Sequence, residues 1–501
     1  MADKQKTFFL GVVIEMASMP LNMLLSFIVV PIYLQYITTA EYGYWSTTLE
    51  MVGLGGLLLV SFDLWMVRGI SGSQGRGDRI KLILLEGASC IALLTLLAGL
   101  ALTGVWLLRP DLLERFQINR EPILILAMIA WAILMTINQY FNSILMGQNR
   151  MPLSNSLVNL TKFGYMLIPV AFLWAGWQLS SFGFGYVIMT LVILVIQLAL
   201  LTPQVLKWSA YPLPSALRLK ETLNFALQNF LSKVGAHFYN YANILLIAHF
   251  YSSVQVAIYL LSLKLTNFTR FIVPRVINVG YPSYARLIAE GEKDRMTEVL
   301  LKLFRISLRL GLLFSAVIIL LNEIFVVHWV GEHHYAGGWF SLLAGLICLK
   351  ESVFPIFFQS FFASDQVQKT HRIFLAEWTL HLGLAIWLIP QYGITGALGA
   401  ALFSTSLLSL FYFAFSITRM LEFSPLQLVK NGGIILLKSL PTLGVLALTR
   451  WQQAQSFNWF YFFLWLALAG LVNLISFEGN HWRELKGLKP KEMIQMIIDR
   501  T

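Results

Sequence analysis

Basic side chains recur at helical spacing inside two long apolar stretches of this sequence. In the first stretch, Lys233 and His237 lie four residues apart and are flanked at similar spacing by asparagines, which predicts one polar helix face. In the second, Lys264 and Arg275 fall within about 60° of each other at 100° per residue, whereas Arg270 points about 120° away from Lys264. Arginine binds phosphate oxygens in bidentate fashion and lysine adds a point charge. The spacing therefore predicts a cationic surface that binds an anionic ligand.

Lys162 is the one basic residue inside the apolar stretches of the first half. Charges at membrane depth cost about 2.5 kcal/mol or more and usually face a cavity or a partner. We therefore predict a substrate-binding set made of Lys162, Lys233, His237, Lys264, Arg270 and Arg275. The alternative is that these cations pair with acidic neighbours or, for Arg275, anchor in the head-group region. The cavity interpretation is favoured for Lys233, Lys264 and Arg270.

Three acidic residues in apolar stretches are candidates for ion coupling: Glu15, Asp63 and Glu377. Glu15 either binds a proton or sodium ion or serves as a counter-ion for Lys162 or the other basic residues. Asp63 lies five residues before an arginine, which favours a local pair. Glu377 lies one helical turn from His381, so this couple either binds a proton or makes an interhelical hydrogen bond.

Lys350 and Glu351 are adjacent, and we interpret them as a couple that neutralises itself. The motifs G-x-S-x-G, G-x-x-x-x-G-K-[ST] and H-E-x-x-H do not occur in the sequence, and no Cys/His cluster has metal-ligand spacing. These motifs mark nucleophilic hydrolases, phosphate-binding loops and zinc proteases, respectively. The sequence therefore predicts a protein that is not an enzyme or an ATP-driven pump and that carries no cofactor or metal.

About fourteen hydrophobic stretches must position these residues. Hydrophobic residues make up 57% of the chain and charged residues 12%, about half the charged fraction of soluble domains. Stretches of about 20 apolar residues can satisfy their backbone groups in lipid as helices. We therefore predict an all-α integral membrane protein with about 14 transmembrane helices. The expected spans are 8–34, 43–67, 81–108, 122–146, 153–174, 180–205, 221–250, 255–283, 299–326, 338–363, 372–391, 394–418, 431–449 and 457–477.

The distribution of Lys and Arg predicts the orientation. With the N-terminus in the cytoplasm, the inner loops and tails hold 22 of the 36 basic residues. The outer loops hold four: Arg109, Arg115, Arg120 and Arg450. Cytoplasmic loops carry the excess of Lys and Arg, so both termini are predicted to be cytoplasmic. The net charge of +11 thus reflects membrane topology, and no nucleic-acid partner is expected.

An internal sequence repeat predicts two pseudo-symmetric six-helix lobes. The pattern Trp-x3-Gln-x4-Gly that begins at Trp174 recurs at Trp387, at the expected outer hairpin between the fifth and sixth helix of each set. Lobes with the same orientation can rock around a central site, whereas the alternative is a duplication without such motion. The predicted domains are an N-lobe at 1–215, a C-lobe at 216–425, helices 13 and 14 at 426–478 and a cytoplasmic tail at 479–501.

Three local patterns carry a family resemblance. The first helix leads through Pro31–Leu34 into Glu41-Tyr42-Gly43; the eighth ends in Tyr281–Arg286; the eleventh and twelfth meet at Tyr392–Ala401. With the repeat and the basic second lobe, the chain resembles the MATE-like polysaccharide flippases of the MOP superfamily, which include the Wzx-type O-antigen transporters. The second-half counterpart of the Tyr-Gly turn lacks its glycine, so that turn departs from the pattern.

The resemblance implies an alternating-access flippase in the bacterial cytoplasmic (inner) membrane. Such a protein moves an undecaprenyl-pyrophosphate-linked oligosaccharide to the outer leaflet for lipopolysaccharide or other surface-glycan synthesis. It implies that the anionic pyrophosphate head lies among the basic residues and that membrane lipid and a glycan polymerase are partners. One alternative is a MATE-type multidrug/cation antiporter, for which an acidic cavity is expected. A second is a membrane enzyme of lipid-linked glycan assembly, although the longest predicted outer loop spans only 109–121.

Overall fold

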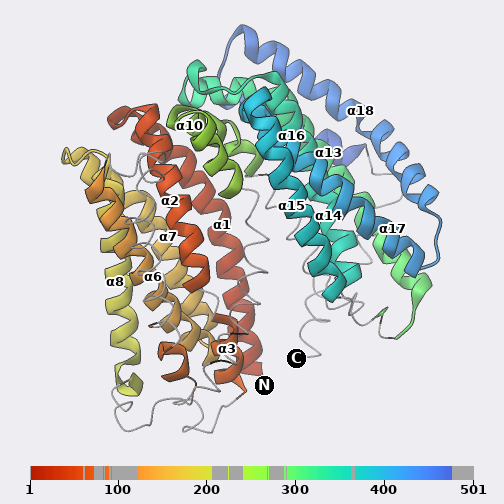
Figure 1. The fold of residues 1–501 in the computed structure, drawn as a ribbon. Coiled ribbons are helices and arrows are strands. Elements are labelled where there is room, and N and C mark those ends of the chain that lie inside the picture. The colour runs from red at the N-terminus through yellow and green to blue at the C-terminus, as the bar shows by residue number, and fades with distance from the viewer. Residues whose placement is uncertain are drawn as a thin grey trace. The chain divides into compact units, whose positions relative to one another are not determined.

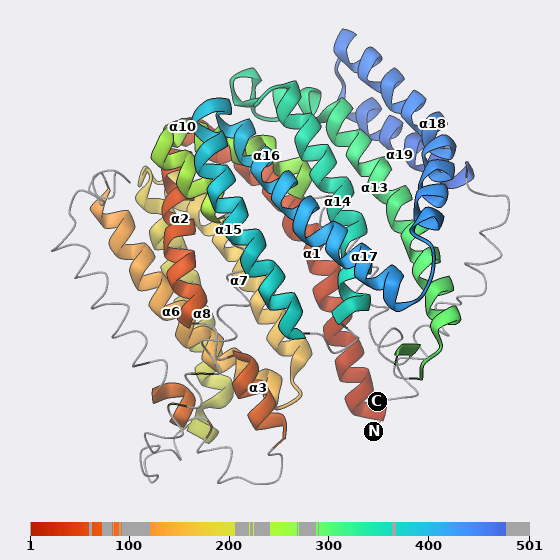
Figure 2. The same ribbon diagram turned by 45° about the vertical axis from the view of Figure 1, so that its right-hand side comes forward.

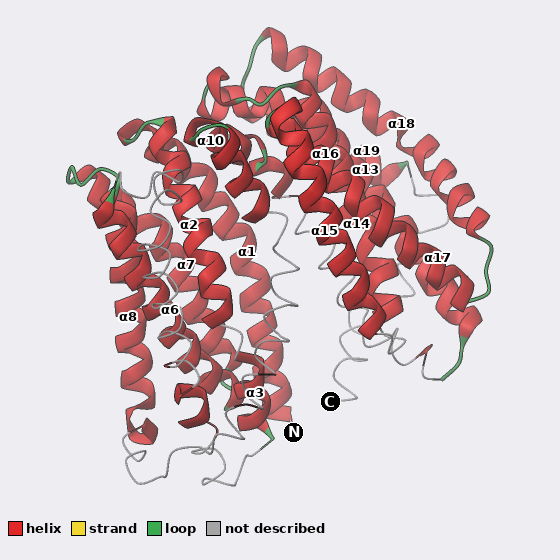
Figure 3. Ribbon diagram, viewed as in Figure 1, coloured by secondary structure: helices red, strands yellow, loops and turns green. Residues whose placement is uncertain are grey.

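The computed structural model describes residues 2–59, 63–72, 83, 85–89, 92, 121–205, 220, 224, 241–267, 269, 287–288, 290–362 and 367–476. Every regular element among these residues is a helix (Figure 3), which confirms the predicted all-α class. Nine of the described helices are long and apolar enough to cross a membrane. The predicted total of about fourteen stays a prediction.

The chain divides into two compact units, Met1–Val254 and Gln255–Thr501, which we call unit 1 and unit 2. The predicted boundary between lobes, at residues 215 and 216, lies outside the described residues and stays a prediction. Each unit is described by itself below.

Unit 1 is a bundle of long helices (Figure 1). The helix α1 packs on α7, and both α6 and α7 pack on α8. A further short apolar helix covers Tyr241–Phe250. The numbered helices are α1 (Ala2–Tyr36), α2 (Thr39–Leu59), α3 (Asp63–Ser71), α6 (Pro122–Gly147), α7 (Met151–Trp174) and α8 (Ser180–Val205).

The hairpin between α6 and α7 shows how local sequence sets these boundaries. Helix α6 begins at Pro122, where the missing N–H of proline costs nothing because the first helical turn leaves its donors unpaired. Asn149, in the connecting turn, adopts a positive φ of 62°, a conformation that asparagine tolerates better than most residues. Both helices therefore match the predicted spans 122–146 and 153–174 closely.

Apolar packing holds the short helix α3 against the end of α6. Met66 and Ile70 of α3 are each 1% exposed, and they join Tyr140 and Ile144 of α6 in one buried cluster. A Cβ atom added at Gly147 would lie 2.7 Å from Ile70 Cβ. Glycine is therefore required here for the two backbones to approach this closely.

Unit 2 contains the longest helix of the described chain (Figure 2). Its elements are α10 (Ser253–Ser262), which crosses the unit boundary, α13 (Lys293–Val330), η4 (Glu332–His334), α14 (Gly338–Phe362), α15 (Val367–Tyr392), α16 (Ile394–Ser404), η5 (Thr405–Leu410), α17 (Phe411–Met420), α18 (Pro425–Gln455) and α19 (Trp459–Ile475). At 1.5 Å per residue α13 is about 57 Å long, well beyond a hydrocarbon core of about 30 Å. Its first turns, which precede the predicted span 299–326, therefore extend beyond the hydrocarbon.

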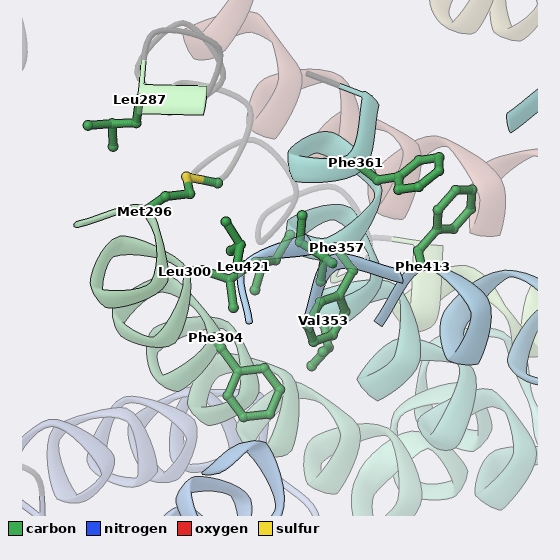
Figure 4. Packing of buried hydrophobic residues seen from close by; sticks show 11 residues of the cluster. Leu287, Met296, Leu300, Phe304, Val353, Phe357, Phe361, Phe413 and Leu421 are labelled. Carbon is green, nitrogen blue, oxygen red and sulfur yellow. The ribbon is translucent and has the colours of Figure 1, made fainter. Parts of the chain in front are cut away.

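An aromatic core joins α13, α14 and α17 (Figure 4). Phe304 of α13 and Phe357 of α14 lie in one cluster with the fully buried Phe413 of α17. Phe413 makes an edge-on contact with Phe358 at 5.7 Å between ring centroids. Aromatic pairs in such geometry contribute about 0.5–1.5 kcal/mol beyond their buried area, so this cluster fixes the relative positions of the three helices.

Polar contacts fasten the α18–α19 hairpin onto α13. Arg309 donates from Nε to Asn473 Oδ1 at 2.8 Å and also to the backbone carbonyl of Asn473. Near the other end of α13, Arg450 of α18 pairs with Glu323 at 2.9 Å. At least part of the positive charge of α13 is thus used to dock the last two helices.

An ion pair closes the loop between α17 and α18 onto the start of α13. The Lys293 ammonium donates to the Glu422 carboxylate, and this hydrogen bond holds the pKa of Glu422 below its ordinary value. Glu422 has a positive φ of 58°. The pair is exposed to solvent, so it orders the loop and adds little to global stability.

Candidate functional site

The described residues include four of the nine predicted site residues with their side chains: Glu15, Lys162, Lys264 and Glu377. Four others lie outside the described residues: Lys233, His237, Arg270 and Arg275. Asp63 is the first residue of α3, and its side chain is likewise outside the description. The cationic surface that the sequence predicts on the seventh and eighth helices therefore stays a prediction.

Lys162 is one of the residues that line a cavity in unit 1. The cavity has a volume of about 110 Å³ and is enclosed by helices α6, α7 and α8. Lys162 itself is exposed, whereas Asn138, Asn142 and Gln197 on the cavity wall are buried. The remaining lining residues are Met135, Gln139, Val158, Thr161, Tyr165 and Ile193. Four amide side chains and one lysine thus belong to the lining of a cavity whose accessible surface is mostly apolar.

Two amide oxygens of residues that line this cavity have no hydrogen-bond donor among the described residues. The Asn138 Nδ2 group donates to the carbonyl of Thr190 at 3.3 Å, but Asn138 Oδ1 is unpartnered, as is Gln197 Oε1. By contrast, Asn142 Oδ1 accepts a bond from Ser154 at 2.7 Å. A buried acceptor without a donor costs about 1–3 kcal/mol, so each of these two oxygens would gain stability from a hydrogen-bond donor.

A chain of hydrogen bonds fixes the aromatic wall of the cavity. Trp131 donates to the Tyr165 hydroxyl at 2.8 Å, and Tyr165 lies 2.8 Å from the Thr190 hydroxyl. Thr190 donates to the carbonyl of Tyr186 at 2.7 Å, so Tyr165 must be the donor to Thr190. Tyr165 and Tyr186 also stack with centroids 4.3 Å apart. These bonds hold the wall in place, and the Tyr165 hydroxyl proton is already used in the bond to Thr190.

The size and chemistry of this cavity limit what it can bind. Each water needs about 10–15 Å³ of such volume, so the cavity accepts several waters or the edge of one sugar ring. The amide oxygens accept hydrogen bonds from hydroxyl groups, and Lys162 offers a positive charge. An entire oligosaccharide does not fit inside it.

Glu15 lies on α1 in the same unit and is partly buried. One turn earlier in α1, the carbonyl of Gly11 accepts a hydrogen bond from Asn155 Nδ2 of α7 at 2.9 Å. A Cβ atom added at Gly11 would lie 2.8 Å from Met151 Cγ, so α1 and α7 are in close contact at this level. The coupling role of Glu15 stays a prediction.

Lys264 follows α10 in unit 2 and is partly buried. The segment around it is held by polar contacts on both sides: the Ser262 hydroxyl donates to the carbonyl of His334 at 3.0 Å, and the Thr269 hydroxyl lies 3.3 Å from Cys348 Sγ. The Ser262 carbonyl in turn accepts from Asn322 at 3.1 Å. The backbone that carries Lys264 is therefore anchored to α13 and α14.

A second polar cluster lies inside unit 2, between α14, α15 and α16. Lys350 Nζ is 2.6 Å from Glu351 Oε1 and donates to Thr405 Oγ1 at 2.9 Å. The side chain of Lys350 is only 8% exposed. The self-neutralising couple predicted from the sequence is thus confirmed, with Thr405 as a further partner of the ammonium.

Thr405 begins a π-helical turn, η5, in the middle of the apolar segment that contains α16 and α17. Its hydroxyl donates to the carbonyl of Ala401 at 2.7 Å while accepting from Lys350. Single π-turns inside α-helices are rare and occur frequently at functional sites, because they redirect side chains and leave backbone groups available. The lysine of α14 is therefore bound to the turn at which the following helix is irregular.

Glu377 and His381, one turn apart on α15, complete this cluster. His381 is fully buried and makes an interhelical hydrogen bond to the backbone of Ala400, and Lys350 is close enough to interact with it electrostatically. Glu377 is 3% exposed, and its Oε2 has no partner among the described residues. The interhelical bond predicted as one alternative is confirmed for His381, whereas the Glu377 carboxylate retains a vacant acceptor.

Sequence reasoning missed two members of these clusters, Gln197 and Thr405. Gln197 lies in the segment from Phe163 to Leu206 that contains no charged residue, and its amide, like those of Gln178 and Gln204, is a weak signal of a polar surface. Thr405 has no such signal, because threonine is common in membrane helices and usually bonds its own backbone.

Several membrane-spanning helices in each unit and polar clusters at membrane depth define an all-helical, multi-pass membrane protein. A family model described as "Polysaccharide biosynthesis protein" matches residues 9–288, more than half of the chain. The chain belongs to this family.

One curated relative is a probable low-salt glycan biosynthesis flippase, Agl15, of Haloferax volcanii. It is 24% identical over 185 residues, which cover 37% of this chain and 39% of the relative. The matched region thus spans well under half of the relative.

Solved structures show a similar fold across most of the chain. A structure of the lipid II flippase MurJ in an inward closed conformation has a TM-score of 0.71 at 15% identity, covering 95% of this chain and 99% of the other. An inward-facing multidrug resistance transporter of the MATE family has a TM-score of 0.56 at 13% identity, covering 78% and 95%. The chain therefore has the fold of MOP-superfamily transporters, as its sequence motifs predicted.

Proposed function

We propose that this protein is a flippase for a lipid-linked glycan. In the specific form that we favour, it moves an undecaprenyl-pyrophosphate-linked oligosaccharide, of the O-antigen class, from the inner to the outer leaflet of the cytoplasmic membrane by alternating access. Membership in the polysaccharide biosynthesis family carries this proposal. The proposal includes cytoplasmic termini, which the distribution of Lys and Arg predicts, and a glycan polymerase as the expected downstream partner.

The chemistry of the two units supports an anionic, hydroxyl-rich cargo. Lys162 lines one cavity of unit 1 together with the amides Asn138 and Gln197, a combination suited to a phosphate beside sugar hydroxyls. Lys264, with the predicted partners Lys233, His237, Arg270 and Arg275, supplies the remaining positive charge for the pyrophosphate. A cationic drug is the poorer cargo, because the amines at these positions repel it.

We assign proton coupling to Glu377 rather than to Glu15 or Asp63. Lys350 and Glu351 neutralise each other, so an ionised Glu377 adds an uncompensated charge to a buried site, and such a site favours uptake of a proton. One experiment compares Glu377 with the two other acidic candidates, Glu15 and Asp63. Export driven by a proton gradient should lose its gradient dependence in Glu377→Gln and keep it in Glu15→Gln and Asp63→Asn. Loss of that dependence in either control instead would reassign the coupling site.

The function is tested by deleting the gene and measuring surface glycan together with the intracellular pool of lipid-linked glycan. Deletion should abolish export and raise the inner pool, and the wild-type gene should restore both. Deletion that leaves export and the lipid-linked pool unchanged would reject the flippase proposal.

Lys162 provides the matched test of the binding site. Lys162→Ala removes a charge from the lining of the cavity, and we expect roughly tenfold lower export, as for a lost charge-assisted hydrogen bond of about 1.5 kcal/mol. Lys430→Ala, at an exposed position near the start of α18, removes the same charge elsewhere and should export normally. Equal export by the two variants at equal protein level would remove Lys162 from the site.

A further inference from the structure

The cavity between α6, α7 and α8 in unit 1 offers few exposed polar groups for a site that is expected to meet a glycan. Three of its four amide side chains are buried, whereas the fourth, Gln139, is partly exposed. Lys162 is exposed. A ligand in the cavity therefore meets a mostly apolar surface that carries one amide and one ammonium group.

The two hydroxyl groups of the lining already use their protons within the protein. Thr161 donates to the carbonyl of Leu157 at 2.8 Å, and Tyr165 donates to Thr190. The Gln139 side chain, by contrast, makes no hydrogen bond within the part of the chain that the structure describes. Its amide donates from Nε2 and accepts at Oε1, so it can form both hydrogen bonds of a secondary amide on a ligand.

The apolar part of the lining comes from all three helices: Met135 of α6, Val158 of α7 and Ile193 of α8. A sugar hydroxyl placed against these side chains loses its hydrogen bonds to water without replacement, which is unfavourable. A methyl group placed there is stabilised, because burial of apolar surface is favourable. The lining therefore suits a substituent in which an amide carries a methyl group.

The acetamido group of an amino sugar is such a substituent, and the volume of the cavity admits it. Its four heavy atoms replace about four waters, which need roughly 40–60 Å³, and the cavity has about 110 Å³. In a glycosyl phosphate the phosphate is attached to C1 of the sugar, so the substituent on C2 is the nearest one to it. A phosphate bound by Lys162 therefore brings the C2 substituent to the lining that Lys162 shares with Gln139.

We propose that this cavity binds the acetamido group on C2 of the sugar attached to the lipid phosphate, so that the protein prefers a cargo whose first sugar is a 2-acetamido sugar. The inference rests on the proposed function, which supplies the lipid-linked glycan with its phosphate at Lys162, and it deepens that function by naming the class of sugar. Gln139 pairs with the amide of the substituent, and Val158 contacts its methyl group. Lys162 binds the phosphate whichever sugar follows, so different side chains recognise the charge and the sugar.

Native mass spectrometry of the purified full-length protein tests the proposal with two synthetic probes, polyprenyl pyrophosphates that carry either N-acetylglucosamine or glucose. The wild type should bind the first probe roughly tenfold more tightly, which corresponds to about 1.4 kcal/mol. Gln139→Met removes the amide and Val158→Phe fills the cavity, so each variant should bind the two probes equally. Lys162→Ala should weaken the binding of both probes alike and keep the preference. The matched controls Gln427→Met and Val429→Phe, at exposed positions of α18, should bind as the wild type does.

The melting temperature of each variant shows whether it is folded. A wild type that binds both probes equally, or binds neither, would overturn the proposal, and so would a preference that both cavity variants retain. Loss of the preference in either folded cavity variant supports it. Failure of the proposed function is distinguishable, because the wild-type gene would then not restore glycan export in the deletion strain. A wild-type gene that restores export, beside a purified protein without the preference, would reject the acetamido site alone.

Discussion

Replacing Lys350 by methionine is the sharpest test of the buried cluster in unit 2. The substitution keeps the length of the side chain but removes an ammonium that lies 2.6 Å from Glu351 and 2.9 Å from Thr405. Glu351 then remains as a carboxylate without its adjacent cation. Thr405 loses the donor that binds it at the start of the π-turn.

The expected loss of stability follows from the burial of the pair. Removing one partner of a buried ion pair costs about 3–5 kcal/mol. The Glu351 side chain is 26% exposed and can be partly hydrated, so we expect about 3 kcal/mol, the lower end of that range. An unfolding entropy of about 2.1 cal/mol/K per residue gives about 0.5 kcal/mol/K for a unit of roughly 250 residues. The melting temperature of unit 2 should therefore fall by about 6 °C.

Thermal unfolding of the purified protein in detergent measures this shift. The double variant Lys350→Met/Glu351→Gln removes both charges and should recover at least half of the loss, because the cost lies in the uncompensated carboxylate. Thr405→Val, which removes a neutral hydroxyl together with its bonds to Lys350 and to the Ala401 carbonyl, should cost about 1 kcal/mol. A shift below about 1 °C in Lys350→Met, or a double variant as unstable as the single one, would refute the reasoning.

Three further predictions concern packing and the loop at the start of α13. Gly396→Ala places a Cβ 2.3 Å from the Leu388 carbonyl oxygen and should lower the melting temperature, whereas Gly470→Ala meets nothing and should leave it unchanged or raise it through helix propensity. Arg309→Ala removes the bonds to Asn473, so α19 should exchange its amide hydrogens faster, with Arg419→Ala as the unaffected control. The lowered pKa of Glu422 means that its pair with Lys293 is intact above the ordinary glutamate pKa and is lost as the pH falls through the lowered value. A spin label in the 421–424 loop should therefore become mobile at acidic pH, and in Lys293→Ala it should be mobile at every pH.

The helix pattern was accessible from the sequence because lipid imposes a simple rule on it. Apolar segments of fixed length must be helical, and α6, α8 and α14 begin and end within about two residues of the predicted spans. The extension of α13 to Lys293 and of α18 to Gln455 was not predicted. These ends lie outside the hydrocarbon, where hydropathy carries no information about helix length.

The polar clusters were only partly accessible. The Lys350–Glu351 couple could be predicted because opposite charges that are adjacent at membrane depth usually pair with each other. The cavity beside Lys162 could not, because its wall combines residues from three helices whose mutual rotation depends on packing. The π-turn at Thr405 has the same origin, because it depends on tertiary contacts: the Thr405 hydroxyl bonds the carbonyl of Ala401 and is itself bound by Lys350 of another helix.

The buried cluster of Lys350, Glu377 and His381 in unit 2 lies beside the junction between α16 and the π-turn η5. His381 of α15 bonds the backbone at Ala400, and Lys350 of α14 bonds Thr405 five residues later. Two neighbouring helices thus hold the segment on either side of the point where α16 gives way to η5. A proton that enters at Glu377 changes the field at His381, one turn away, and therefore acts on a contact that fixes this segment. If Glu377 couples export to a proton gradient, α16 and η5 are the elements that should move, and Thr405→Val should uncouple export from the gradient while protein folding is retained.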